Sequence, residues 1–321
     1  MVSDLDYVPL DLRNLPIGVP LTCDLYIRAK EQYVLYREAS LPFKEIDRKR
    51  LMSSGVTNLW IRMGGDSFLE QQLASLLAQP DEQLPPHAKA ELLYTSAAAI
   101  TKRAVTNVSP ASLADVDKLI GTTVSHLALN RTAFPALLSV MLHDFSVYTH
   151  ALNVAVYAIS LARFVGIADN QDLRNLGVAA IFHDAGKARI PNEILNKPGP
   201  LSPEEWAVMR QHPLLGTELL SQAGDLPEIV LKVVGQHHER LDGSGYPMGI
   251  GGEDFHQFSM IVALADSYDA MTCDRSYRSS LTPFRALSLL KEETVAAGKL
   301  DPTLFACLVR LLGNPDQRTA I

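Results

Sequence analysis

Histidine and aspartate residues recur at regular intervals through the C-terminal half of the chain. Successive members lie 25 to 33 residues apart, and they are His150, His183 with Asp184, His212, His237 with His238, and Asp266. This interval is about the length of one helix plus a connection, so we expect one ligand or ligand pair from each helix. A helical bundle can direct such imidazole and carboxylate groups into one interior pocket, where they would bind metal.

The adjacent ligand pairs predict two metal ions rather than one. Neighbouring residues of a helix diverge by about 100°, so neither pair can direct both of its side chains at one small ion. A carboxylate such as Asp184 can instead bridge two ions roughly 3.5 to 4 Å apart. The ligand types favour iron or manganese, with zinc and nickel as competitors. Two such ions can activate water against a phosphoryl group, which predicts hydrolysis of a phosphate ester.

Basic residues and a glycine-rich loop accompany these ligands. Lys187 follows His183 in "HDAGK", where its cation would lie beside the metals. Arg275 and Arg278 are three residues apart in "DRSYR", a spacing that places both guanidinium groups on one side of a helix or turn, where they can clamp a phosphate. The "DGSGYP" segment at residues 242–247 predicts a tight turn that borders the substrate mouth.

Composition excludes several classes of protein. The 321 residues favour two domains, and 47% apolar with 20% charged residues is ordinary for a globular chain. A net charge of -7 disfavours binding to long nucleic acids. Cys23, Cys273 and Cys307 are interpreted as reduced packing residues. Neither a membrane-spanning run nor a leader is recognised, so we expect a cytoplasmic protein without membrane contact.

The elements that must position the ligands are mainly helical. Residues 1–63 predict a small α+β module with a hairpin that turns near Lys30 and Glu31, a short helix over 46–52 and a strand in "TNLWIRM". From about Asp66 the pattern is helical, with breaks at 79–88 and at 107–112, where Ser109 can cap a helix that begins at Pro110. Beyond residue 131 successive amphipathic stripes predict an all-α bundle.

The quoted motifs resemble those of the HD-GYP domain, a branch of the HD phosphohydrolase superfamily that hydrolyses cyclic di-GMP. The matching strings are "HDAGK" and "HHERLDGSGYP", supported by "HALNVA", "QHPLLG" and "LADSYDAMTCDRSYR". The resemblance covers residues from about 140 to 310. It implies an HD-type helical catalytic domain at 131–321 and a regulatory or sensory region at 1–130.

The resemblance also implies roles for single residues. Metal binding falls to His150, His183, Asp184, His212, His237, His238 and Asp266. Asp184 and Lys187 would be catalytic, and substrate contacts would come from Lys187, Arg275, Arg278, Gly245, Tyr246 and Pro247. Some members carry a glutamate, four residues before the first histidine, that helps to bind a third metal. Ser146 stands there in this chain, so two ions are favoured.

The function implied is hydrolysis of cyclic di-GMP to pGpG by hydroxide activated between two divalent transition metal ions, iron or manganese. Whether hydrolysis continues to GMP stays open. Two alternatives stay open. One is a degenerate domain that binds a cyclic dinucleotide or a partner protein without cleaving it, and the other is a phosphodiesterase for cyclic GMP-AMP. The resemblance implies two further partners. Diguanylate cyclase domains would bind the GYP loop, which contains Gly245, Tyr246 and Pro247, and a second copy of the chain would form a homodimer.

The other histidines are interpreted as structural. They are His87, His126, His143 and His256. His143 and Asp144 form a second "HD" pair without the following glycine and lysine, so we expect Asp144 at most to orient the helix that carries His150.

Overall fold

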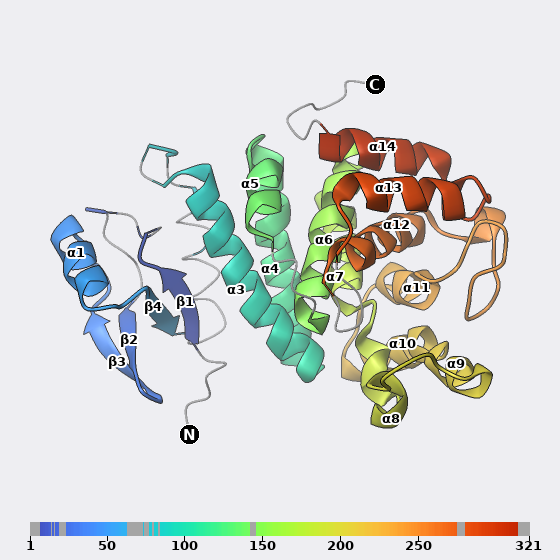
Figure 1. Cartoon of the computed structure of the whole chain (residues 1–321), viewed down its shortest axis with the longest axis horizontal. Coiled ribbons are helices and arrows are strands. Elements are labelled where there is room, and N and C mark those ends of the chain that lie inside the picture. The colour runs from blue at the N-terminus through green and yellow to red at the C-terminus, as the bar shows by residue number, and fades with distance from the viewer. Residues whose placement is uncertain are drawn as a thin grey trace. The chain divides into compact units, whose positions relative to one another are not determined.

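The computed structural model describes residues 7–13, 15, 17–18, 24–62, 73, 77–78, 80–82, 84–141, 146–274 and 280–313. The chain divides into two compact units, one of Met1–Ala99 with Ser125–Met141 and one of Ile100–Val124 with Leu142–Ile321. Figure 1 shows that most of the chain is helical and that the strands gather near the N-terminus, which confirms the predicted fold class. The predicted division into a regulatory or sensory region, 1–130, and a catalytic domain, 131–321, stays a prediction.

The first unit contains a small antiparallel sheet with the strand order β1-β4-β2-β3. The strands are β1 (Tyr7–Asp11), β2 (Leu25–Ala29), β3 (Gln32–Arg37) and β4 (Asn58–Arg62), and the helix α1 (Glu45–Ser53) precedes β4. The hairpin of β2 and β3 turns at Lys30, whose φ is 57°, as the sequence predicted. Leu25, Leu59 and Phe43 are fully buried and form the centre of this unit's core. The predicted α+β module is therefore confirmed.

Among the described residues, three helices come between β4 and the second unit's bundle, and the division into units falls within two of them. They are α3 (Pro86–Thr106), α4 (Pro110–Leu129) and α5 (Ala133–Val140). The Ser109 hydroxyl accepts a hydrogen bond from the backbone N–H of Ser112 at 3.3 Å, so the predicted cap before Pro110 is confirmed.

The second unit is a helical bundle in which α6 (Val147–Phe164), α7 (Asn170–Phe182), α10 (His212–Ala223), α11 (Glu228–Gln236) and α12 (Gln257–Thr272) carry the predicted ligands. Its other helices are α8 (Asn192–Leu195), α9 (Pro203–Met209), α13 (Pro283–Leu290) and α14 (Pro302–Gly313), with the short turns η2 (Ala185–Arg189), η3 (Gly252–Asp254) and η4 (Lys291–Val295). The predicted succession of helices beyond residue 131 is confirmed.

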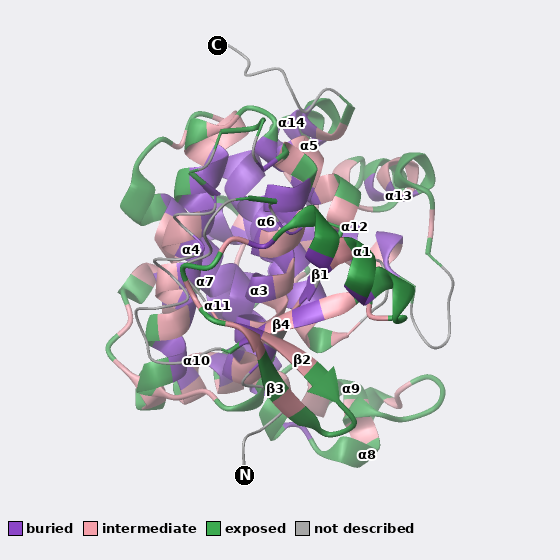
Figure 2. Cartoon of the chain, turned by 90° about the vertical axis from the view of Figure 1, so that its left-hand side faces the viewer, coloured by how far each residue is buried: buried purple, intermediate pink, exposed green. Residues whose placement is uncertain are grey.

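Helix α6 forms the centre of the bundle. Its side chains from Thr149 to Ala162 are all buried, and α7, α12 and α14 pack against it. Figure 2 shows the buried residues concentrated in α6 and α7, whereas α8 and α9 are largely exposed. Small residues such as Ala151, Ala155 and Ala158 allow neighbouring helices to approach α6 closely. This dense core holds in place the helix that carries His150.

Two further expectations concern the cysteines and the membrane. Cys273 and Cys307 are buried thiols, as expected for packing residues, while Cys23 lies outside the described residues. In the part of the chain that is described, no helix combines the length and the apolar character that a bilayer crossing requires.

Candidate metal centre

The five ligand-bearing helices bring all of the predicted metal ligands to one buried place. His150 lies in the first turn of α6 and Asp266 in the middle of α12, and the other ligands lie at helix ends. His183 and Asp184 join α7 to η2, His212 begins α10, and His237 with His238 ends α11. Because the adjacent pairs sit where helices end, the backbone can turn both members toward the centre.

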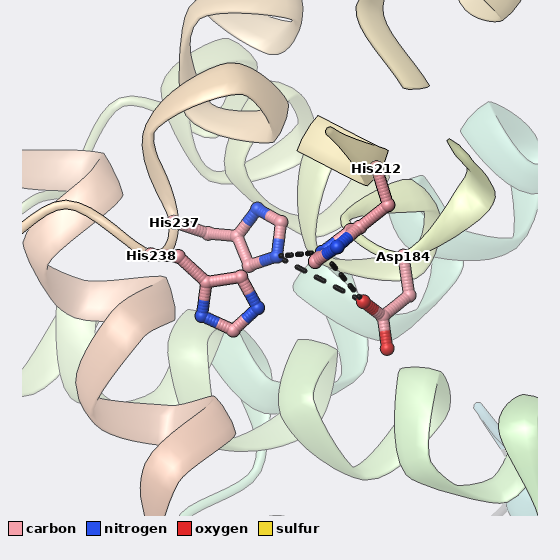
Figure 3. Close-up of side chains that lie close together, drawn as sticks. All are labelled: Asp184, His212, His237 and His238. Atoms are coloured by element: carbon pink, nitrogen blue, oxygen red, sulfur yellow. Dashed lines mark hydrogen bonds and ion pairs between the residues drawn. The ribbon is translucent and has the colours of Figure 1, made fainter. Parts of the chain in front are cut away.

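Asp184 is the residue that the two halves of the cluster share. One potential metal-binding group contains Asp184, His212, His237 and His238, and the other contains His150, His183 and Asp184. The donor atoms of each group lie within 4.8 Å of one another. Asp184 Oδ1 lies 3.3 Å from His212 Nε2, and Asp184 Oδ2 lies 3.4 Å from His183 Nε2. Figure 3 shows Asp184 facing the imidazoles of His212 and His237, with His238 beside them.

Three of the histidines are oriented by their own backbone. In each, Nδ1 lies close to the carbonyl oxygen three residues earlier: His183 to Ala180 at 2.8 Å, His212 to Met209 at 2.9 Å and His237 to Val234 at 2.7 Å. A neutral imidazole that donates its Nδ1 hydrogen carries a free lone pair on Nε2. All three Nε2 atoms therefore face the centre in the form that binds metal.

Two buried atoms of the centre have no hydrogen-bond partner among the described residues, His183 Nε2 and Asp184 Oδ1. Moreover, the Nε2 atoms of His212 and His237 lie 3.2 Å apart, although both carry lone pairs when their Nδ1 hydrogens are donated elsewhere. Buried polar atoms without partners are costly, and facing lone pairs repel. A cation among these atoms would resolve both conflicts, so the residues fit divalent metals.

His150 is held by two carboxylates. Its Nδ1 lies 2.7 Å from Oδ2 of Asp269, and its Nε2 lies 3.1 Å from Oδ1 of Asp266. Burial lowers the pKa of His150, but the hydrogen bonds to Asp266 and Asp269 outweigh burial and raise it to about 9. Asp269 is buried and was not recognised in the sequence, although it lies one helical turn after Asp266 and so faces the same way.

The electrostatics of the other ligands favour the protonation states that bind metal. Burial raises the pKa of Asp184, but Lys187 and His183 outweigh it and hold this pKa well below its usual range. Burial likewise raises the pKa of Asp266, but the hydrogen bond from His150 and the nearby His150, His183 and His238 together outweigh burial and hold this pKa well below its usual range. Burial lowers the pKa of His237 well below its usual value and that of His238 to about 3. Ionised carboxylates and neutral imidazoles are the ligand forms.

The "HDAGK" segment is packed tightly against α10. A side chain at Gly186 would place its Cβ 1.9 Å from the carbonyl oxygen of His212, so only glycine allows this approach. Lys187 lies in the following turn, and its Nζ is 2.5 Å from Asp184 Oδ2. In this arrangement the lysine is engaged with the shared carboxylate.

The predicted GYP loop lies against the end of α11. The ring of Tyr246 stacks on that of His238 with centroids 4.6 Å apart, and its backbone N–H donates to the carbonyl of His238 at 3.2 Å. A Cβ at Gly245 would approach Glu239 Cα to 2.4 Å. Pro247 then leads to Met248. The sequence reasoning placed this loop at the site but did not single out Glu239.

Glu239 fastens the far side of the loop. Its carboxylate is fully buried and accepts the backbone N–H groups of Met248 at 2.7 Å and Ile250 at 3.1 Å. Asp242 braces the beginning of the loop, because its Oδ1 accepts the backbone N–H of Ser244 at 3.0 Å. The loop is thus tied to the residue that directly follows the two histidines.

Some residues named in the sequence analysis are not among the described residues. Arg275 and Arg278 lie outside the described residues, as do His143 and Asp144. Ser146 caps α6, and its hydroxyl accepts the backbone N–H of Thr149 at 3.2 Å. The position that carries a glutamate in some relatives therefore serves as a helix cap here.

Comparisons with known proteins agree with this geometry. A family model described as HD domain matches residues 136–304, which include all of the predicted metal ligands. A cyclic di-GMP phosphodiesterase of Pseudomonas aeruginosa is 29% identical over 285 residues, covering 84% of this chain and 68% of the relative. A 3'3'-cGAMP-specific phosphodiesterase of Vibrio cholerae is 36% identical over 173 residues, or 54% of this chain and 37% of the relative.

A solved structure has a similar fold. An HDG"Y"P protein from Bdellovibrio bacteriovorus matches with a TM-score of 0.67 and 21% identity, covering 96% of this chain and all of the other. This likeness concerns the fold.

Proposed function

Because the chain belongs to the HD domain family, we propose that it is a metal-dependent phosphodiesterase that hydrolyses cyclic di-GMP to pGpG. The relative from Pseudomonas aeruginosa, which matches across 84% of this chain, is named as a cyclic di-GMP phosphodiesterase. The chain spans 68% of that relative and 37% of the Vibrio cholerae relative. The activity of the whole protein is therefore a proposal.

The position of Asp184 carries the proposal. Its carboxylate lies between two groups of imidazoles, and its Oδ1 has no hydrogen-bond donor of its own among the described residues. His150 and His183 would hold one divalent ion, His212 with His237 and His238 would hold the other, and Asp184 would be common to both. Asp266, which contacts His150, would complete the set.

When bound, two divalent transition metal ions, iron or manganese by ligand chemistry, would polarise a phosphoryl oxygen and lower the pKa of attacking water. The chain's own residues would orient the reaction. The backbone carbonyls that receive the Nδ1 hydrogens keep the imidazoles directed inward. Lys187 keeps Asp184 ionised and adds a cation that attracts the anionic substrate.

A second substrate is supported by similarity. The relative from Vibrio cholerae acts on 3'3'-cGAMP by name, and it shares 36% of its residues with this chain over the matched region. Cyclic GMP-AMP and cyclic di-GMP have the same phosphodiester ring and differ in one base, so the metal centre would treat both alike. Regulation through residues 1–130, docking of diguanylate cyclase domains on the GYP loop, a homodimer and a cytoplasmic location stay predictions.

The proposal is tested by metal and product analysis. Protein purified without oxygen should contain about two transition metal ions per chain and should convert cyclic di-GMP to pGpG, as resolved by chromatography. Asp184→Ala should lose most of the metal and the turnover while keeping its helical circular dichroism. His87→Ala is the matched control, because His87 is exposed and contacts Ser139 in the first unit. Metal-loaded protein that binds the dinucleotide but releases no product over hours would favour the binding-only alternative.

A further inference from the structure

The proposed substrate carries two phosphodiester groups, but the metal centre can act on only one of them at a time. The second phosphate would be bound by a cation outside the centre, because charge-assisted hydrogen bonds to phosphate are strong. Among the described residues, which do not include Arg275 and Arg278, two cations near the centre are already engaged: Lys187 pairs with Asp184, and Arg240 donates to the carbonyl of Glu239 at 2.9 Å. A third, Arg210, is exposed.

Arg210 is placed beside the centre by its neighbours in the chain. It ends α9, directly after Met209, whose carbonyl receives the Nδ1 hydrogen of His212. Its guanidinium carbon lies 5.6 Å from the centre of the Tyr246 ring, which in turn stacks on His238 at 4.6 Å. A dinucleotide bound at His238 would therefore extend over Tyr246 to Arg210.

The contacts of Arg210 are aromatic faces rather than acids. It lies over Tyr246 and over Trp206, whose ring centre is 5.9 Å away, and it forms no ion pair with a carboxylate within the described part of the chain. A guanidinium that packs through its face keeps the N–H groups at its edge available. These can bind two oxygens of one phosphate in parallel, a strong and directional contact.

Trp206 adds a surface for a base. It lies one helical turn before Arg210, and the residue is 45% exposed although its side chain is among the largest apolar ones. Exposed aromatic rings next to arginine are the elements with which proteins stack nucleobases. Arg210 thus lies close to two aromatic rings, those of Trp206 and Tyr246.

From this arrangement, and resting on the proposed function, we propose that Arg210 binds the phosphate of the cyclic dinucleotide that is not being cleaved, while Trp206 stacks on one of its bases. Arg210 and Trp206 are then substrate-binding residues outside the metal centre. No covalent step is assigned to either of them.

The experiment compares two substrates on the metal-loaded full chain. Cyclic di-GMP has two phosphodiester groups, whereas bis(p-nitrophenyl) phosphate has one and reports on the metal centre alone. Arg210→Gln should raise KM for cyclic di-GMP at least tenfold, the usual effect of losing a charge-assisted contact, and should change KM for the small diester far less. Arg210→Lys, which keeps the charge but loses the fork, should fall between the two.

The matched control is Arg189→Gln. Arg189 lies in the same unit but pairs with Glu218 at 3.1 Å and Gln222 at 2.6 Å on the surface, so both KM values should stay at the wild-type level. Trp206→Ala should raise KM for cyclic di-GMP several-fold, as expected when one stacked base loses its partner.

The outcomes separate this inference from the proposed function. Wild-type protein that cleaves neither cyclic di-GMP nor cyclic GMP-AMP overturns the proposed function itself. If wild-type protein is active and Arg210→Gln leaves KM for cyclic di-GMP unchanged, or weakens both substrates equally, only the role of Arg210 is overturned. A loss confined to the dinucleotide supports it.

Discussion

At the scale of single residues, the direction of His150 depends on a carboxylate outside the ligand set. Asp269 lies 2.7 Å from His150 Nδ1 and is 1% exposed, so the contact is shielded from water. Such partners fix the ring orientation of a ligating histidine and increase its basicity. Cys273 Sγ, 3.4 Å from the same carboxylate, adds a weak contact. Asp269 would therefore influence a bound metal through His150.

We expect Asp269→Asn to weaken metal binding by about 10- to 100-fold, because the amide neither carries the charge nor selects the correct imidazole tautomer. The measurement is a titration of metal-free protein with Mn²⁺ in competition with a chelator. Asp225→Asn is a suitable control, since Asp225 is exposed. Equal metal affinity of Asp269→Asn and wild type would show that His150 is oriented without this carboxylate.

At the scale of elements, the close packing of η2 on α10 joins two ligand-bearing segments. The contact depends on the absence of a side chain at Gly186, since a Cβ there would lie 1.9 Å from the carbonyl oxygen of His212 and 2.4 Å from the backbone nitrogen of Gly216. Asp184 and His212 approach each other only because these two backbones touch.

Gly186→Ala should force η2 away from α10 and destabilise the second unit by about 3 kcal/mol, as expected for overpacking against backbone atoms. Urea denaturation followed by circular dichroism would measure this loss. In Gly313→Ala, the added methyl group meets no atom within 4 Å and stability should change little. Similar midpoints for both variants would mean that η2 can shift at little cost.

The loop that follows α11 is a second element with a defined fastening. Glu239→Gln keeps the shape of the side chain but replaces one of its two acceptor oxygens, so only one of the N–H groups of Met248 and Ile250 retains its partner. We expect faster hydrogen exchange over residues 242–250, measured by mass spectrometry. Glu253→Gln is the control, because Glu253 is exposed. Unchanged exchange in Glu239→Gln would exclude the fastening.

At the scale of the whole molecule, acid should destabilise the first unit through one buried histidine. His126 belongs to the first unit and is only 5% exposed, and burial lowers its pKa to about 4. The unfolded chain binds a proton near pH 6.5 and the folded chain does not, so stability is full above pH 6.5 and falls as the pH decreases toward 4. At pH 5 this single histidine would cost about 2 kcal/mol.

His126→Gln should therefore be less stable than its parent at pH 7.5, and this difference should shrink by about 2 kcal/mol at pH 5. In a Trp206→Phe background the remaining tryptophan, Trp60, reports on the first unit by fluorescence during urea unfolding. His87→Gln controls for the loss of a histidine that is exposed. A difference that does not depend on pH would show that His126 is protonated equally in both states.

Much of this arrangement could be predicted from the sequence, because periodic patterns and specific motifs determine it locally. The hairpin at Lys30 and the cap at Ser109 depend on residues close together in the chain, and both were recognised. The contact of Asp269 with His150 joins residues 119 apart, which no local pattern encodes. Arg210 was not recognised for the same reason, because its proposed role depends on its contact with Tyr246 in a later segment of the chain.

The stacking of Tyr246 on His238 links the outer surface of the loop to the centre beneath it. A protein that bound the loop and displaced Tyr246 would also displace the imidazole of His238, one of the proposed metal ligands. Linkage is reciprocal, so an ion that favours one position of that imidazole also favours the matching position of the loop. The position of the loop would then depend on whether metal is bound in the centre. A protein that docks on the loop could distinguish the metal-bound enzyme from the metal-free one.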